Sequence, residues 1–559
     1  MAKLQDGSFY VRSRAAFGLT HTKAAPKVDN FKAHWLATFI EEWLRDAHYM
    51  SVLAVIYLLL LFCWLLIFWA RPLWLLSISG FLYRYEPKIK TQNMDINLPL
   101  RHLLLVSLFH FRERVLDRWV LKYLETAREN FESRPTVKQR NAYVQSPAEL
   151  DGAMCESVSL SQLQPVFDKP KTAMLIFGEG GAGKTSLTCQ LASWAMADKP
   201  EDRLCKGHRM LPVLIEGNIE AGEKNALIET ISGHLKELIG EPEPVSEELL
   251  SRLLRKRRVL VIVDSLSELD SATRNLINPV RSDFPAAALI VTSRLDDELR
   301  SATRTTIKPL RLQSDRLSKF INDYLVNRKK RDSFTDEEYF DSCRRLSQIV
   351  GNREITALIA KLYAEQMIAG REQTADFNLP RNLPDLMLGY VKIINERVQT
   401  NGKETRDVQR AAKILAWACL KQTCRPAVAK RIEALKAMKE ESDGQTMLGY
   451  LEDRLQLIQT VGSGDDDLRF SLDPLAEYLA CLHLVEECGR HKRKWEEVFD
   501  RINSQPGKPE TIRGFLLALR DCCEHKGPDH GVPETVLEKL SFILSPAPEA
   551  VSGKQPEFV

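Results

Sequence analysis

Residues 175–187, LIFGEGGAGKTSL, carry the clearest structural signal in the chain. The apolar run Met174–Phe177 has the length of a strand and leads directly into Gly178–Thr185, which fits the pattern GxxxxGK(S/T). A helix is expected to begin at about Lys184. The glycines let successive backbone N–H groups turn inward, and the N-terminus of the following helix adds a partial positive charge. A strand, a glycine-rich loop and a helix in this order predict a phosphate-binding loop of the Walker A kind.

The loop and the residue after it form the predicted nucleotide-binding site. Lys184 is expected to reach the β- and γ-phosphates, and Thr185 to bind Mg²⁺. A chance glycine-rich turn is the alternative, but the strand before the loop and the helix after it favour the phosphate-binding interpretation. The predicted nucleotide-binding residues are Gly178, Glu179, Gly180, Gly181, Ala182, Gly183, Lys184, Thr185 and Ser186.

Three further apolar runs of strand length follow the loop, at Leu211–Ile215, Val259–Val263 and Ala287–Thr292. Each is almost wholly apolar, as strands buried on both faces of a parallel sheet are. The helical stretches between them require right-handed crossovers. The sequence therefore predicts a three-layer α/β domain of the P-loop NTPase kind.

Polar side chains at the ends of two of these runs complete the predicted site. Asp264 follows Val259–Val263 and should emerge at the carboxyl edge of the sheet, where it would share Mg²⁺ with the loop. Glu268, one helical turn later, is placed to polarise the attacking water, although it could simply cap a helix. Arg294 follows the last run and is expected to contact phosphate or to lock a neighbouring domain. Glu268, Lys184 and Arg294 are the predicted catalytic residues.

The run Met50–Ala70 has 21 residues and no charge. A helix of that length spans about 30 Å, the thickness of the hydrocarbon core of a bilayer. A buried core helix is the alternative, but such helices are usually shorter, so a transmembrane helix is predicted. More basic residues follow the run than precede it, which favours a cytoplasmic C-terminal part. A hairpin with a shallower segment at Leu73–Leu82 is the alternative to a single pass.

Composition narrows the classes of protein to consider. A chain of 559 residues is too long for one hydrophobic core. A net charge of +3, from 78 basic and 75 acidic residues, gives no indication of nucleic-acid binding. The eleven cysteines have no zinc-site spacing and are interpreted as reduced cytosolic thiols.

The rest of the chain favours helices. Amphipathic helices follow one another from Gln313 to about Leu544, with a short hairpin expected around Gln456–Phe470. An amphipathic helix is also expected at Phe31–Ala47. The predicted organisation is a tail with this helix (1–48), transmembrane segment or segments (49–85), a helical stalk and linker (86–150), the nucleotide-binding domain (151–310), a helical domain (311–404), a winged-helix domain (405–487), a helical C-terminal region (488–545) and a disordered tail (546–559).

These motifs resemble those of the NACHT ATPases of the STAND class, relatives of the NOD-like receptors. The segments that carry the resemblance are LIFGEGGAGKTSL (175–187), VLVIVDSLSELD (259–270), LIVTSRL (289–295) and LRFSLDPLAEYLACLHL (468–484). The resemblance covers about residues 170–490 and implies the helical and winged-helix domains. It further implies that ADP holds a closed monomer and that exchange for ATP permits homo-oligomerisation, in response to a protein or ligand trigger that the sequence does not identify.

Three positions depart from the family pattern. Ser267 stands where a second acidic residue is usual, Leu472 stands where the winged-helix domain normally presents a histidine, and residues 351–367 lack the expected proline. Bacterial members of the class are associated with defence against phage. The resemblance thus implies a role in antiphage defence, and together with the predicted transmembrane helix it favours a bacterial inner-membrane protein.

The predicted function is a membrane-anchored, ATP-binding signalling switch with slow Mg²⁺-dependent ATPase activity. Two alternatives remain: a mechanochemical ATPase related to the AAA class, and a nucleotide-binding scaffold that does not hydrolyse ATP. A GTPase is less favoured because the chain has no NKxD guanine-recognition motif.

Overall fold

The structure is a computed structural model. It describes residues 47–84, 88–91, 94–97, 100–138, 140, 143–219, 225–296, 299, 302–351, 354–372, 379–398, 402–438, 444–461 and 467–544. The expected disordered tail (546–559), and the amphipathic helix at 31–47 except its last residue, lie outside the described residues. The chain divides into two compact units, Met1–Trp119 and Val120–Val559.

The first unit contains α3 (Ala47–Ala70), the helix that the long apolar run predicts. Its segment Ser51–Ala70 has a mean hydropathy of 2.8, and none of it is buried within the structure. By length and composition alone, α3 could cross a membrane. The helix stops at Arg71, and Pro72 begins α4 (Pro72–Arg84) with its ring at a first-turn position, where a missing N–H costs nothing. At 13 residues, α4 is too short to span a bilayer.

The remainder of this unit is short elements rather than one continuous stalk. They are β1 (Lys88–Thr91) and β2 (Met94–Asn97), which pair antiparallel, then α5 (Leu100–Leu103), η2 (Val106–Leu108) and the start of α6 (Glu113–Ser133). Contacts with the end of α3 hold this segment in place: Trp64 Nε1 donates to the Leu104 carbonyl at 2.7 Å, and Arg114 donates to the Trp69 carbonyl at 3.0 Å.

The second unit begins within α6 and is built on a seven-stranded sheet in the order β4-β3-β9-β5-β8-β7-β6. The strands β5 to β9 are parallel, while β3 runs antiparallel to β4 and β9. The four predicted apolar runs are confirmed as β5 to β8. The bounds are β3 (Ala148–Leu150), β4 (Ala153–Cys155), β5 (Thr172–Phe177), β6 (Leu211–Ile215), β7 (Val259–Val263), β8 (Ala288–Ser293) and β9 (Thr305–Pro309).

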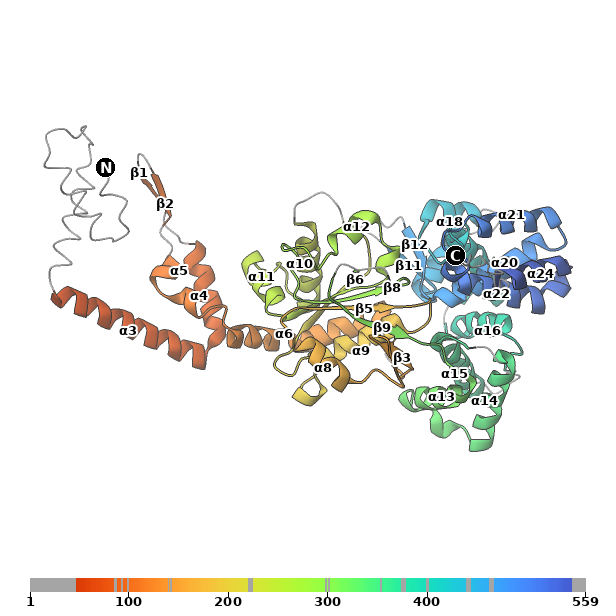
Figure 1. Ribbon diagram of the computed structural model, residues 1–559, viewed down its shortest axis with the longest axis horizontal. Helices are drawn as coiled ribbons and strands as arrows, with labels where there is room; N and C mark the ends of the chain where they lie inside the picture. Colours follow the sequence, from red (N-terminus) through yellow and green to blue (C-terminus); the bar gives the residue numbers. More distant parts are fainter. Residues whose placement is uncertain are drawn as a thin grey trace, which may run out of the picture. The chain divides into compact units, whose positions relative to one another are not determined.

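Helices cover both faces of this sheet. Figure 1 shows α8 and α9 on one side and α10 and α12 on the other, and α9 packs against β6, β7 and β8. This is the layered α/β arrangement that right-handed crossovers produce. The elements are α7 (Pro135–Lys138), α8 (Leu160–Phe167), α9 (Lys184–Met196), η3 (Pro200–Asp202), α10 (Ala226–Ile239), α11 (Glu247–Arg255), η4 (Leu266–Glu268) and α12 (Ser271–Leu276).

After β9 the described chain is mainly helical, as expected. A three-stranded antiparallel sheet, in the order β10-β12-β11, interrupts it and includes the predicted hairpin. The elements are α13 (Ser314–Asn327), η5 (Arg331–Ser333), α14 (Asp336–Val350), α15 (Ala357–Glu372), α16 (Leu383–Glu396), α17 (Thr405–Leu420), β10 (Ala429–Lys430), α18 (Arg431–Ala437), α19 (Gly444–Gly449), the π-helical turn η6 (Tyr450–Arg454), β11 (Ile458–Val461), β12 (Asp467–Phe470), α20 (Asp473–Cys488), α21 (Lys492–Asn503), η7 (Glu510–Ile512), α22 (Arg513–His525), α23 (Gly527–His530) and α24 (Glu534–Leu544).

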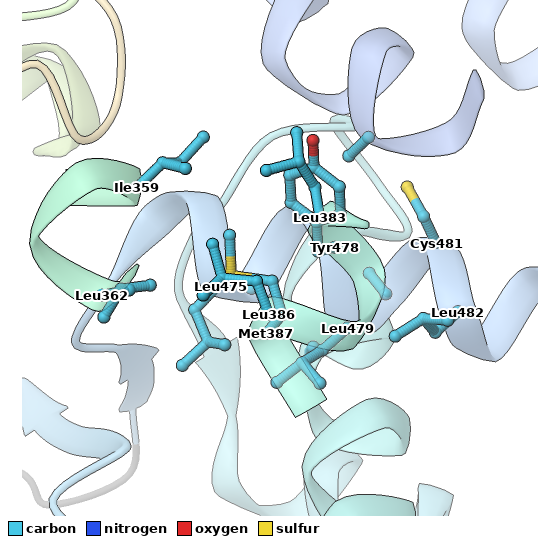
Figure 2. Packing of buried hydrophobic residues seen from close by; sticks show 14 of the residues in the cluster. Ile359, Leu362, Leu383, Leu386, Met387, Leu475, Tyr478, Leu479, Cys481 and Leu482 are labelled. Atoms are coloured by element: carbon cyan, nitrogen blue, oxygen red, sulfur yellow. The ribbon is translucent and has the colours of Figure 1, made fainter. Parts of the chain in front are cut away.

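One continuous hydrophobic core joins these helices, and α20 lies at its centre. Figure 2 shows Leu475 and Leu479 of α20 among Leu386 and Met387 of α16, with Cys481 on the same helix. On another side α20 packs against α17 and α22. Twelve of the sixteen residues of α20 are buried. This packing fixes α20 relative to α16, α17 and α22, so its N-terminus can place side chains accurately.

Candidate functional site

The phosphate-binding loop has the backbone conformation that its glycines allow. Gly181 and Gly183 have φ values of +74° and +98°, in the left-handed region that other residues avoid. Gly183 is also the N-cap of α9, so the free N–H groups of that helix face the loop. Lys184 Nζ folds back and donates to the carbonyls of Gly178 and Glu179, both at 2.8 Å. Burial lowers the pKa of Lys184, although the nearby carboxylates oppose this. The loop is thus preorganised around a buried cation.

Thr185 and Asp264 lie together at the carboxyl edge of the sheet. The Thr185 hydroxyl donates to the Asp264 carboxylate at 3.1 Å, and the Thr292 hydroxyl donates to the same carboxylate at 2.6 Å. A hydroxyl and a carboxylate beside a phosphate loop are the oxygen ligands that Mg²⁺ uses when phosphates and water supply the rest. These residues fit such an ion. In the described part of the chain, no cluster of three or more His, Cys, Asp or Glu side chains forms a separate metal site.

Glu268 and Arg294 form an ion pair beside the loop. Arg294 Nε donates to Glu268 Oε1 at 2.8 Å, and each side chain is 12% exposed. Ser267, which departs from the family pattern, accepts a hydrogen bond from the Arg294 backbone N–H at 3.1 Å. That bond ties η4 to the end of β8. The structure therefore brings all three catalytic candidates, Lys184, Glu268 and Arg294, to one place.

Two side chains from residues 405–487, predicted as a winged-helix domain and called here the winged-helix region, also enter this site. Asp473, the first residue of α20, accepts a hydrogen bond from Arg294 Nη2 at 2.9 Å. Arg469 on β12 pairs with Glu268 Oε2 at 3.4 Å and donates to Ser265 Oγ at 3.2 Å. The result is an alternating chain of charges, which we call the charge chain: Arg469, Glu268, Arg294 and Asp473.

The sequence analysis missed Arg469 and Asp473. More than 170 residues separate Asp473 from Arg294, so only the tertiary fold brings them together. One signal was present: Asp473 directly follows Leu472, the position where a histidine normally faces the phosphate.

The charge chain lowers the pKa of Glu268, and a neighbouring carboxyl group, Glu477, has a raised pKa. Burial would raise the pKa of Glu268, but the guanidinium groups of Arg469 and Arg294 outweigh it and hold the pKa at about 2. Glu477, one turn after Asp473 on α20, has the opposite shift, because burial raises its pKa to about 8 despite the attraction of Arg294. Glu268 is therefore ionised at neutral pH, whereas Glu477 is largely protonated.

The N-terminus of α20 lies directly against the loop. A Cβ atom added to Gly180 would be 2.8 Å from Asp473 Cβ, and one added to Gly181 would be 2.5 Å from Pro474 Cγ. The helical domain touches the loop as well, because the Leu358 N–H donates to the Gly181 carbonyl at 3.2 Å. Arg311 pairs with Glu179 within the loop. The loop is thus enclosed by two regions that follow it in sequence.

A cavity of about 760 Å³ opens beside the first glycines of the loop. Its walls come from the loop, from the start of α15, from α20 and from α22. The buried hydroxyl of Thr356 faces it and has no hydrogen-bond partner among the described residues. Space for a small ligand therefore exists where the nucleotide-binding, helical, winged-helix and C-terminal regions meet.

Comparison with known protein families agrees with this architecture. Residues 172–328 match the NACHT domain, and residues 504–542 match the NACHT C-terminal helical domain 4. The first match contains the loop, Asp264, Glu268 and Arg294, and the second contains α22. No protein of curated function matches the chain.

Proposed function

We propose that this chain, a nucleotide-binding NTPase of the NACHT type, is a membrane-anchored switch in which the nucleotide controls whether the winged-helix region stays closed on the phosphate-binding loop. In the closed arrangement the protein would be monomeric, and opening would expose surfaces for self-association. Mg²⁺-dependent hydrolysis of ATP would be slow and would reset the switch.

The observation that carries the proposal is the contact between the N-terminus of α20 and the phosphate-binding loop. Asp473 lies against Gly180 and forms a buried ion pair with Arg294. An incoming phosphate would seek the same guanidinium and the same loop face. A carboxylate and a phosphate cannot both occupy this place without strong repulsion, so nucleotide binding and closure are coupled. Such coupling is what a switch requires.

The residues of the site suit the roles that the sequence predicts. Lys184 and the loop N–H groups would bind the phosphates, and Thr185 with Asp264 would hold Mg²⁺, which when bound neutralises phosphate charge. Arg294, once released from Asp473, is placed to contact the terminal phosphate. Glu268 is placed to orient the attacking water.

The membrane part of the proposal rests on α3. Its 20-residue apolar segment, none of which is buried, supports anchoring in a bilayer with the nucleotide-binding domain in the cytoplasm. An inner-membrane role in bacterial antiphage defence is motivated by the resemblance to bacterial NACHT ATPases, and a plaque assay with and without the Lys184→Ala variant tests it.

The switch is tested by sizing the full-length protein in detergent with ADP, with ATP and with a non-hydrolysable ATP analogue. Asp473→Asn removes the charge and keeps the shape, so we expect this variant to form oligomers at lower ATP concentration than the unmodified protein. Asp500→Asn, on the exposed face of α21, is the matched control. Identical sizes in all nucleotide states, for both variants, would refute the switch. Equilibrium binding of a fluorescent ATP analogue tests nucleotide binding separately.

A further inference from the structure

We propose that Arg469 is a positioning residue that withholds Glu268 from water while the winged-helix region is closed, so that release of β12 and activation of hydrolysis are one event. This inference rests on the proposed function and assigns the control of its hydrolytic step. Arg469 acts through Glu268 and is not itself a catalytic residue.

The direction of the Arg469 side chain follows from its strand. On β12, Leu468 and Phe470 are buried in the core of the winged-helix region. Because successive side chains on a strand point to opposite faces, Arg469 points away from that core. It reaches the nucleotide-binding domain, where it contacts Glu268 and Ser265. The burial of Leu468 and Phe470 fixes the position of β12, and this determines the direction of the Arg469 side chain.

In the closed arrangement each carboxylate oxygen of Glu268 faces a guanidinium group. Arg294 donates to Oε1 at 2.8 Å, and Arg469 pairs with Oε2 at 3.4 Å. A carboxylate that orients an attacking water must accept a hydrogen bond from it. A water could reach Glu268 only by competing with these guanidinium groups for the oxygens of a side chain that is only 12% exposed. The closed arrangement therefore opposes hydrolysis.

Arg469 differs from the other cations around Glu268. Lys184 and Arg294 belong to the nucleotide-binding domain and remain beside Glu268 whatever the winged-helix region does. Arg425, which follows α17, contributes to the electrostatic field but forms no ion pair with Glu268 in the described part of the chain. Arg469 is thus the contact of Glu268 that is lost when the winged-helix region opens.

Asp473, at the other end of the charge chain, restrains Arg294 as Arg469 restrains Glu268. Asp473 neutralises Arg294 from the same winged-helix region, three residues beyond β12. One movement therefore frees both working side chains of the site, the glutamate from Arg469 and the arginine from Asp473. Hydrolysis before opening is opposed because Glu268 is still paired with Arg469 and Arg294 is still paired with Asp473.

The test uses full-length protein with Arg469→Gln and compares kcat and KM for ATP with those of the unmodified protein. Loss of one charge-assisted contact to Glu268 should raise kcat on the order of tenfold, with KM nearly unchanged. Arg469→Lys keeps the charge but cannot reach Glu268 and Ser265 together, so an intermediate increase is expected. In a Glu268→Gln background, Arg469→Gln should have no effect on turnover.

Arg371→Gln is the matched control. Arg371 pairs with Glu338 at 2.9 Å between α15 and α14, and its loss should leave kcat unchanged. If Arg469→Gln is poorly folded, the Lys variant alone still decides the sign of the effect.

A fall in kcat for Arg469→Gln would mean that Arg469 assists the reaction, and an unchanged kcat would mean that it does not control Glu268; either overturns the inference. No hydrolysis by any variant would also overturn it while leaving nucleotide-dependent switching intact. Failure of every variant to bind the fluorescent ATP analogue would instead refute the proposed function.

Discussion

A methyl group added to Gly180 should force the winged-helix region away from the loop. The Gly180→Ala Cβ would be 2.8 Å from Asp473 Cβ and 2.9 Å from Asp473 Oδ2, whereas ordinary contact begins at 3.4 Å. Gly180 has no left-handed φ, so alanine fits its backbone without strain. The N-terminus of α20 would have to retreat by about 0.6 Å, at the expense of the 2.9 Å hydrogen bond between Arg294 and Asp473.

Overpacking of this size costs about 1–3 kcal/mol. If the cost falls on the closed state, the ratio of closed to open molecules falls about 5- to 150-fold. Hydrogen exchange of the α20 amides, measured without nucleotide, becomes faster when loss of the loop contact lowers the free energy of local opening of this helix. We expect faster exchange in Asp473–Cys488 for Gly180→Ala than for the unmodified protein.

Two further variants isolate the steric cause. Gly233→Ala adds the same methyl group to α10, where it would meet no atom within 4 Å, and should leave exchange in α20 unchanged. Asp473→Gly removes the atoms that the new methyl group would strike, so the double variant Gly180→Ala/Asp473→Gly should exchange no faster than Asp473→Gly alone. Unchanged exchange in Gly180→Ala, or an additive double variant, would refute the contact between loop and helix.

Three other outcomes follow from the structure. Asp264→Asn should abolish the Mg²⁺ dependence of ATP-analogue binding, measured by titration with and without the ion, and retained dependence would remove Asp264 from the metal site. Because burial raises the pKa of Glu477 from 4.5 to about 8, the folded state binds the extra proton, and stability should fall as pH rises between these values, by at most about 5 kcal/mol. Thermal denaturation should show this loss, and Glu477→Gln should abolish it. Leu59→Arg puts a charge on the exposed surface of α3, at a cost of about 3 kcal/mol in a bilayer, and should release the protein on alkaline extraction if α3 spans one.

Local pattern was enough to predict the nucleotide-binding half of the site. The strands β5 to β8 are mainly apolar runs because both faces of the sheet are covered. The loop is recognisable because Gly178–Thr185 fits the pattern GxxxxGK(S/T) between a strand and a helix. By contrast, β9 alternates between buried and partly exposed residues and ends at Pro309, and β3 has only three residues. Neither carries a signal that distinguishes a strand from a loop.

The closing half of the site could not be predicted from local pattern. Arg469 resembles any polar residue that alternates with apolar ones on a hairpin strand, and Asp473 resembles an ordinary acidic residue in the first turn of a helix. Their importance comes from where α20 is held, which the core shared with α16, α17 and α22 determines. Ser267 was read only as a departure from a motif, whereas its hydroxyl accepts a hydrogen bond from the Arg294 backbone.

The packing of α20 against α22 also supplies the protein with an internal chemical reporter. Cys481 and Cys522 are fully buried between these helices, where their thiols donate to the carbonyls of Phe515 and Tyr478. Burial raises the pKa of both thiols well above the usual range, so neither is a nucleophile while the helices are in contact. Alkylating reagents can therefore label these sulfur atoms only in molecules whose helices have separated. The rate at which Cys481 and Cys522 are alkylated therefore measures how often these two helices separate. No cysteine has to be introduced for this measurement.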